Sequence, residues 1–245
     1  MAVIDPEPIA VVGIGCRFPG NVNSTKDFWE TLKQDTNMIG QIPSDRFDSA
    51  SFYHEDRRKY GAVRSDKGGF LDNIQGFDAD IFGYYPSEAS RMDSQQRLAL
   101  EASVHALEDS DTPLNKVAGS RTSVYMGIFS YDHLSIQTAP EQHENISPHT
   151  AMGVLACSTT NRVSHRLNLN GPSLTLDTAC SSSLVAVHLD CQSLWAGESE
   201  AALVGGANTI LRVESSILMS QGGFLSSDGC CKSFDSAAKE MGWCS

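Results

Sequence analysis

One cysteine stands where the surrounding pattern suits a nucleophile. The stretch "LTLDTACSSSLVAVHLDC", residues 174–191, opens with leucines around a β-branched threonine, which predicts a short buried strand. After Cys180, apolar side chains recur at spacings of three and four, which mark one face of a helix: Leu184, Val187, Cys191 and Leu194. Cys180 is therefore expected where a strand ends and a helix begins.

Such a position favours thiol chemistry. The first turn of a helix presents unpaired backbone N–H groups and a partial positive charge. Both favour the thiolate, which is the nucleophilic form of cysteine, and the same N–H groups can hold an oxyanion. Free cysteine also often acts as a small buried hydrophobic residue, so the turn alone leaves that interpretation of Cys180 open.

Other chemical motifs are weak. The seven cysteines and seven histidines are mostly scattered, and the adjacent Cys230 and Cys231 lack the paired spacing of a zinc site. An odd number of cysteines without an export signal favours reduced thiols. Gly13 and Gly15 begin a dinucleotide-binding pattern, but Phe18 stands where that fingerprint needs its third glycine.

Bulk properties exclude some classes of function. The chain has 245 residues, 40% of them hydrophobic, and a formal net charge of −12, which argues against general nucleic-acid binding. No apolar run is long enough to span a bilayer, and the N-terminus does not read as a secretory signal. We expect a soluble, cytoplasmic protein.

The elements that must position Cys180 follow an alternating order. Apolar runs predict strands over residues 8–15, 123–129, 174–177 and 201–210, and the first run looks like a central strand buried on both faces. Helices are expected after the capping pair Ser24 and Asp27, over 91–110, from about 149, and after Cys180. Residues 41–80 are expected to form folded loops anchored by aromatic side chains. The order predicts an α/β fold with a largely parallel central sheet. Gly205 and Gly206 break the last strand and predict a close backbone approach.

Several stretches together resemble the ketosynthase (β-ketoacyl synthase) domain of modular polyketide synthases and animal-type fatty acid synthases. They are "EPIAVVGIGCRFPG", "GGFLDNIQGFDADIFG", "PSEASRMDSQQRLALE", "NRVSHRLNLNGPSLTLDTACSSSLVAVHLDCQSL", "LVGGANTIL" and "GFLSSDGCCKSFDSAA", in the family's order and spacing. The resemblance implies a thiolase-like fold of two similar halves. A degradative thiolase shares that fold, but the "DTACSSS" and "MDSQQR" segments look like ketosynthase.

The resemblance also implies a reaction. An acyl chain moves from the phosphopantetheine of an acyl carrier protein onto Cys180, and a malonyl unit then loses carbon dioxide and attacks the thioester. Thr178 and Ala179 would shape the turn, while Phe234 and Asp235 match a loop near the active-site entrance. No bound cofactor or metal is implied. The implied partners are the acyl carrier protein and a second copy, paired through the strand that ends at Asp177.

One part of the family pattern is missing. The family needs two histidines, in "HGTGT" and "NIGH" runs of its second half, and this sequence contains neither run. We therefore expect residues 1–245 to form the N-terminal half of a ketosynthase, inactive in condensation when alone. The alternative is a truncated, non-catalytic paralogue.

A basic loop is the last candidate site. Residues 56–69 gather five basic residues in an acidic chain: Arg57, Arg58, Lys59, Arg64 and Lys67. Such a patch could steer an acidic carrier protein. An ordinary solvated loop, partly neutralised by Asp56 and Asp66, is the simpler interpretation.

Overall fold

The computed structural model describes residues 7–56, 59–226, 228–232 and 234–236. These residues fall into two compact units. The first comprises the chain up to residue 16 together with residues 74–208, and the second comprises residues 17–73 and those from 209 onward. Cys180 belongs to the first unit.

A parallel sheet organises the first unit. Within the described residues it has three strands in the order β4 (Ser173–Leu176), β3 (Thr122–Ile128), β5 (Ala201–Ala207). Every residue of β3 is buried, as expected for a strand with neighbours on both sides. The predicted α/β class and parallel sheet are confirmed, and the predicted strand positions hold within a few residues for these three strands.

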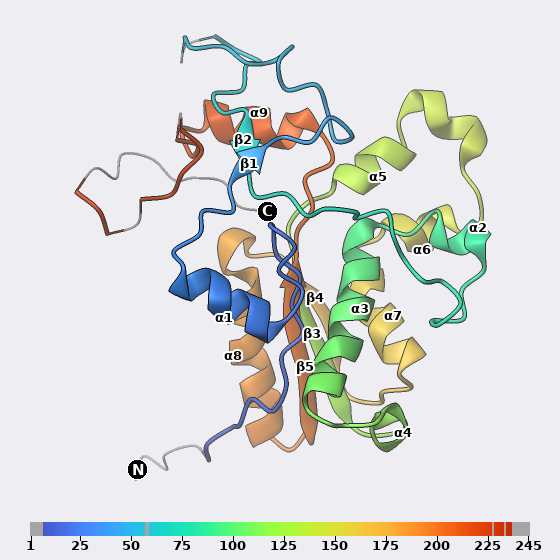
Figure 1. The fold of residues 1–245 in the computed structure, drawn as a ribbon. Helices are drawn as coiled ribbons and strands as arrows, with labels where there is room; N and C mark the ends of the chain where they lie inside the picture. Colours follow the sequence, from blue (N-terminus) through green and yellow to red (C-terminus); the bar gives the residue numbers. More distant parts are fainter. Residues whose placement is uncertain (1–6, 57–58, 227, 233, 237–245) are drawn as a thin grey trace, which may run out of the picture. The chain divides into compact units, whose positions relative to one another are not determined.

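Helices cover both faces of this sheet (Figure 1). α8 (Ser182–Trp195) packs on one face, against β3 and β5. α3 (Ser94–Asp109) and α7 (Ser158–Arg166) pack on the other face and against each other. The main apolar core lies in this second layer and includes Met92, Leu100, Val124, Val163 and Leu203.

Shorter helices complete the unit. They are α2 (Pro86–Ala89), α4 (Leu114–Val117), α5 (Asp132–Gln137), the 3-10 helix Pro140–Asn145 and α6 (Thr150–Val154). The helix predicted from about residue 149 is interrupted between α6 and α7, where Leu155 has extended backbone angles. Gly153 lies against the backbone of Arg91, where a side chain would clash.

The prediction of a buried central strand over residues 8–15 is wrong for this structure. The segment is extended but belongs to no ladder, and Val11 is 81% exposed. Its glycines explain its course, because Gly13 and Gly15 lie directly against the backbone of α3 at Ala106 and Ala102. The N–H of Ile14 donates to the carboxylate of Asp109 at 2.9 Å. A side chain of α3 thus accepts the hydrogen bond that the backbone of a neighbouring strand would otherwise accept.

The second unit contains α1 (Thr25–Lys33), a two-stranded antiparallel ladder of β1 (Gly40–Gln41) and β2 (Lys67–Gly68), and α9 (Val213–Gln221). The predicted cap of α1 is confirmed: the Asp27 N–H donates to the Ser24 hydroxyl at 3.1 Å. Residues 41–80 are largely irregular, as predicted, but only some of their aromatic side chains pack against other residues. Phe77 stacks on Phe82, whereas Tyr60 is almost fully exposed.

Candidate active site

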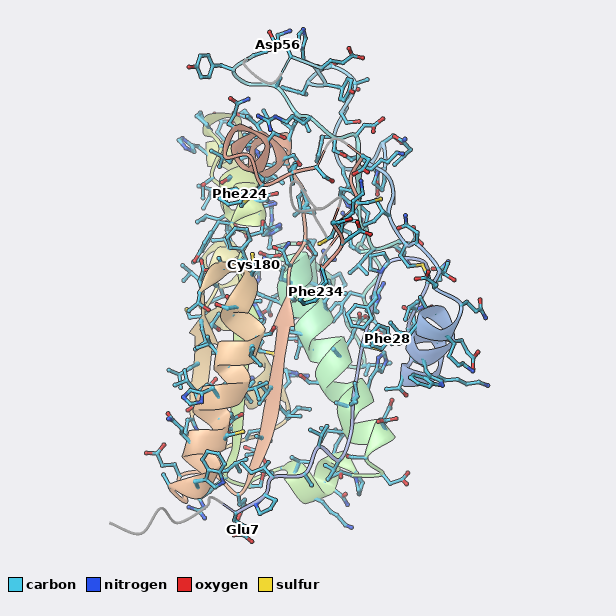
Figure 2. All side chains as sticks on the ribbon, turned by 90° about the vertical axis from the view of Figure 1, so that its left-hand side faces the viewer. Glu7, Phe28, Asp56, Cys180, Phe224 and Phe234 are labelled. Carbon is cyan, nitrogen blue, oxygen red and sulfur yellow. The ribbon has the colours of Figure 1, made fainter. Side chains whose placement is uncertain are left out.

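Cys180 lies at the carboxyl end of the sheet, at the start of α8 (Figure 2). β4 ends at Leu176, a single 3-10 turn spans Ala179–Ser181, and α8 begins at Ser182. The predicted position between a strand and a helix is confirmed. The thiol is free and exposed, so a reactant can reach it.

The turn before Cys180 has an unusual backbone. Ala179 has φ +55°, in the left-handed region that costs residues with a Cβ roughly 1–2 kcal/mol. Hydrogen bonds hold it there. The Ala179 N–H donates to Asp177 Oδ1 at 2.9 Å, and the Ser182 hydroxyl donates to the Ala179 carbonyl at 2.7 Å. The Ser181 hydroxyl donates to the Thr178 carbonyl at 2.8 Å. Thr178 and Ala179 therefore form the turn, and their place in the lining of an active site stays a prediction.

Two glycines let α8 approach the sheet closely. Gly127 on β3 and Gly206 on β5 are register partners. A Cβ on Gly127 would lie 2.6 Å from the Cβ of Ser182, and a Cβ on Gly206 would lie 3.0 Å from that of Ser183. Of the two glycines predicted to break the last strand at a close backbone approach, only Gly206 shows the approach, because a Cβ on Gly205 would meet only the Met126 side chain. β5 runs through both glycines without a break. The need for glycine at Gly127 was not apparent from the sequence.

Tyr131 supports the same turn from the end of β3. Its hydroxyl donates to Asp177 Oδ2 at 3.3 Å, while Oδ1 of that carboxylate accepts from Ala179. Partial burial, followed by the charge of Asp177, raises the pKa of the Tyr131 hydroxyl further above neutral and so favours its hydrogen-donating form. Sequence reasoning missed Tyr131 because 46 residues separate it from Asp177.

The apolar face predicted for α8 is present, but it does not face the sheet. Leu184 is 70% exposed and Val187 is also exposed. The buried side consists of small and polar residues: Ser182, Ala186, Asp190 and Ser193. β4 departs in the same way from the predicted buried strand, because Leu174 is 44% exposed. Close packing on glycine backbone explains the inversion, since large side chains would hold α8 away from the sheet.

A buried carboxyl holds the middle of α8. Asp190 is 1% exposed, and the hydroxyl of the fully buried Ser123 donates to its Oδ1. Its Oδ2 is buried without a hydrogen-bond partner. Burial raises the pKa of Asp190 to about 6, and the bond from Ser123 opposes that shift. The sequence pattern did not single out this aspartate.

The remaining predicted site residues lie in the second unit or outside the described chain. Phe234 is fully exposed with φ +66°, and the Asp235 N–H donates to the Lys232 carbonyl at 3.1 Å. Both stay predictions as parts of an active-site entrance. Arg57 and Arg58 of the basic loop lie outside the described residues.

The described residues hold neither a candidate metal site nor a candidate membrane span. They contain no group of three or more His, Cys, Asp or Glu side chains placed to hold a metal ion. None of the helices in the described part of the chain combines the length and apolar character that a membrane span requires.

The first unit is thus a layered α/β unit with an exposed cysteine between a parallel strand and a helix. The family described as "Beta-ketoacyl synthase, N-terminal domain" matches residues 6–245. The chain belongs to this family.

Its relatives are polyketide synthases. It is 45% identical over 232 residues to one component of the phenolphthiocerol/phthiocerol polyketide synthase of Mycobacterium tuberculosis, covering 95% of this chain and 15% of that protein. Another component of the same synthase is 43% identical over 234 residues, and 11% of its length is covered. The chain thus spans only a small part of these relatives.

Solved ketosynthases share the fold. The oxazolomycin ketosynthase domain OzmH KS7 of Streptomyces albus JA3453 superposes with a TM-score of 0.87 at 33% identity, over 94% of this chain and 40% of that domain. The ketosynthase of module 6 of the bacillaene synthase from Bacillus subtilis 168, in a cysteine-to-serine mutant, gives a TM-score of 0.84 at 35% identity. Of that chain 37% is covered. The predicted thiolase-like fold and N-terminal-half identity are confirmed.

Proposed function

We propose that Cys180 is the acyl-accepting nucleophile of a β-ketoacyl synthase that works in polyketide or fatty acid biosynthesis. The observation that carries this proposal is the exposed thiol of Cys180 between the left-handed Ala179 and the first turn of α8. The helix end stabilises negative charge on sulfur and on a bound oxyanion. Membership of the ketosynthase family supports this role for the thiol.

The acyl-transfer step needs few groups. The Cys180 thiolate attacks the carbonyl carbon of an acyl thioester, and its electron pair forms the new C–S bond. The carbonyl π electrons move to oxygen, and the backbone N–H of Cys180 helps to hold the oxyanion. Collapse of this intermediate breaks the original C–S bond. The pantetheine thiolate leaves and takes a proton from water, and the acyl group remains on Cys180.

Condensation needs more than these residues supply. In the family pattern, two histidines donate to the malonyl thioester carbonyl while it loses carbon dioxide, and the sequence contains neither histidine motif. Loss of one oxyanion-hole donor typically costs about 100-fold or more in rate. We therefore expect residues 1–245 to accept acyl groups without releasing carbon dioxide from malonyl carrier protein.

The proposed partners are an acyl carrier protein, whose phosphopantetheine would deliver both substrates, and a second ketosynthase copy. β4 has a partner strand on one side only among the described residues, and Leu174 on it is exposed. Pairing of two copies along β4 would cover this edge. The exposed apolar side of α8 would likewise be covered by further chain in a complete ketosynthase.

The test is acylation of the full 245-residue chain with an acyl pantetheine thioester, mapped by mass spectrometry. We expect stoichiometric acyl transfer to Cys180, which Cys180→Ala abolishes. Cys157→Ala is the matched control, because Cys157 is also exposed and also precedes a helix, yet its backbone has an ordinary helical conformation. Equal acylation of Cys157 and Cys180, or none, would refute the proposal and favour a non-catalytic chain.

A further inference from the structure

One hydroxyl group spans the whole turn before Cys180. The Thr178 N–H donates to the Ser182 Oγ at 2.8 Å, and the same hydroxyl donates to the Ala179 carbonyl at 2.7 Å. Its acceptor and donor capacities are thus used on the Asp177–Thr178 and Ala179–Cys180 peptide units, one on each side of the Thr178–Ala179 peptide. Ser182 is buried, so water does not compete for these bonds.

The neighbouring serines differ from Ser182. Ser181 is exposed, and its hydroxyl donates to Thr178 only, on the solvent side of the turn. Ser183 is exposed and takes no part in this set of hydrogen bonds. Three consecutive serines in the sequence therefore have three different roles, and only the middle one ties both sides of the left-handed residue to α8.

Ser182 reaches this place because β3 carries no side chain beneath it. The Cβ of an alanine at Gly127 would lie 2.6 Å from the Ser182 Cβ and 2.7 Å from the Ser183 nitrogen. The first contact could not be relieved by a side-chain rotation, because a Cβ does not move with χ1, and the second involves backbone. Any residue larger than glycine at Gly127 must push the first turn of α8, with Ser182, off the sheet.

We propose that Ser182 and Gly127 act together as positioning residues for Cys180. Gly127 seats the first turn of α8 on β3, and the seated Ser182 hydroxyl fixes the Asp177–Thr178 and Ala179–Cys180 peptides. This holds the Cys180 N–H in the direction from which it stabilises an oxyanion formed at Cys180. Neither residue touches the substrate. The inference rests on the proposed role of Cys180 as acyl acceptor.

The first test compares Ser182→Ala with Ser183→Ala in the full chain. Limiting iodoacetamide labels thiols, and mass spectrometry follows Cys180 and Cys16 separately. Cys16 is buried and reports unfolding. We expect Ser182→Ala to slow Cys180 labelling about fivefold, the worth of a typical lost hydrogen bond, while Cys16 stays protected. Ser183→Ala should change neither rate.

Acylation kinetics separate positioning from a general structural role. In Ser182→Ala, kcat for acyl transfer from an acyl pantetheine thioester should fall by the same factor, and KM should not change. Unchanged Cys180 labelling in Ser182→Ala would overturn the proposal. So would loss of Cys16 protection, which would assign Ser182 a role in folding only.

The second test changes Gly127. Gly127→Ala should slow Cys180 labelling at least as much as Ser182→Ala does. The double variant should be labelled only slightly more slowly than either single variant, because both substitutions disturb the same contact between β3 and α8. Gly205→Ala is the matched control, since its Cβ would meet only the flexible Met126 side chain, at 3.0 Å. Additive losses would overturn the coupling. If wild-type Cys180 accepts no acyl group yet its labelling still depends on Ser182, the proposed function fails and the positioning role stands.

Discussion

α3 and α8 lie on opposite faces of the sheet and bury different kinds of side chain. After a first turn that buries polar side chains, α3 buries Leu100 and Leu107 and exposes His105 and Glu108. α8 turns small and polar residues inward and leucine outward. Both helices are well-formed and pack on the same sheet. The difference shows that apolar burial is not what holds α8 in place.

The function of each layer accounts for the contrast. α3 supplies stability, because burial of its leucines removes apolar area from water. α8 must bring its first turn close to the backbone of β3 and β5, and small residues facing Gly127 and Gly206 permit that approach. Hydrogen bonds such as that between Ser123 and Asp190 then replace much of the missing apolar contact. The layer that stabilises the fold and the layer that positions the thiol are distinct.

The largest expected effect is on stability and comes from comparing a buried leucine of α3 with an exposed leucine of α8. Leu100 is 1% exposed, so Leu100→Ala should lower the free energy of unfolding by about 2–5 kcal/mol through lost burial and a cavity. Leu184→Ala, on the outer side of α8, should change it by less than about 0.5 kcal/mol. Urea unfolding of both variants checks this. Similar losses would mean that the outer side of α8 is buried in solution.

Asp190 gives the α8 layer a distinct pH dependence. Its pKa is raised from 3.8 to about 6 in the folded protein. Between pH 3.8 and pH 6 the carboxyl is therefore protonated in the folded state and ionised in the unfolded state. Stability from this group is therefore present at pH 4 and is lost as pH rises through 6. Ionised, the group costs up to about 3 kcal/mol at pH 7, and Asp190→Asn should recover much of that.

The check on Asp190 is urea unfolding of wild type and Asp190→Asn at pH 4, 5, 6 and 7. The gap between the two should open as pH rises. Glu108→Gln, an exposed change on α3, provides the control and should show no such gap. A gap for Asp190→Asn that is constant with pH would show that the carboxyl does not titrate in this range.

The exposed edge of the sheet should respond to charge. If two copies pair along β4, Leu176→Asp would place a carboxylate in the interface without a partner. Light scattering should then show the dimer dissociation constant raised by about tenfold or more, or a monomer. Leu184→Asp lies on α8 and serves as the comparison. A dimer unchanged by Leu176→Asp would exclude β4 as the interface.

The smallest expected effect is a difference in alkylation rate between two thiols, one just before α8 and one within it. Cys180 is exposed before the first turn of α8, whereas Cys191 is partly buried in its last turns. We expect limiting iodoacetamide to label Cys180 several-fold faster than Cys191 in the folded protein. Mass-spectrometric mapping measures both. Equal rates would remove the contrast between the two ends of α8.

The sequence determined the local features of this protein. The Ser24 cap, the buried strand β3 and the strand-to-helix junction at Cys180 all follow from short-range patterns, because capping and periodicity act over a few residues. Gly206 was identified in the same way. The spaced motifs also placed the chain in its family.

Tertiary structure alone decided which faces are buried. The run 8–15 has the composition of a central strand, yet its backbone lies along α3, because glycine fits there and Asp109 accepts the Ile14 N–H. The apolar side of α8 reads as a core face, yet the sheet takes the small side because Gly127 and Gly206 demand close approach. The spacing of apolar residues in the sequence predicts that a helix has one apolar and one polar face. Which face meets the sheet depends on the backbone it packs against, and that partner is far away in the sequence.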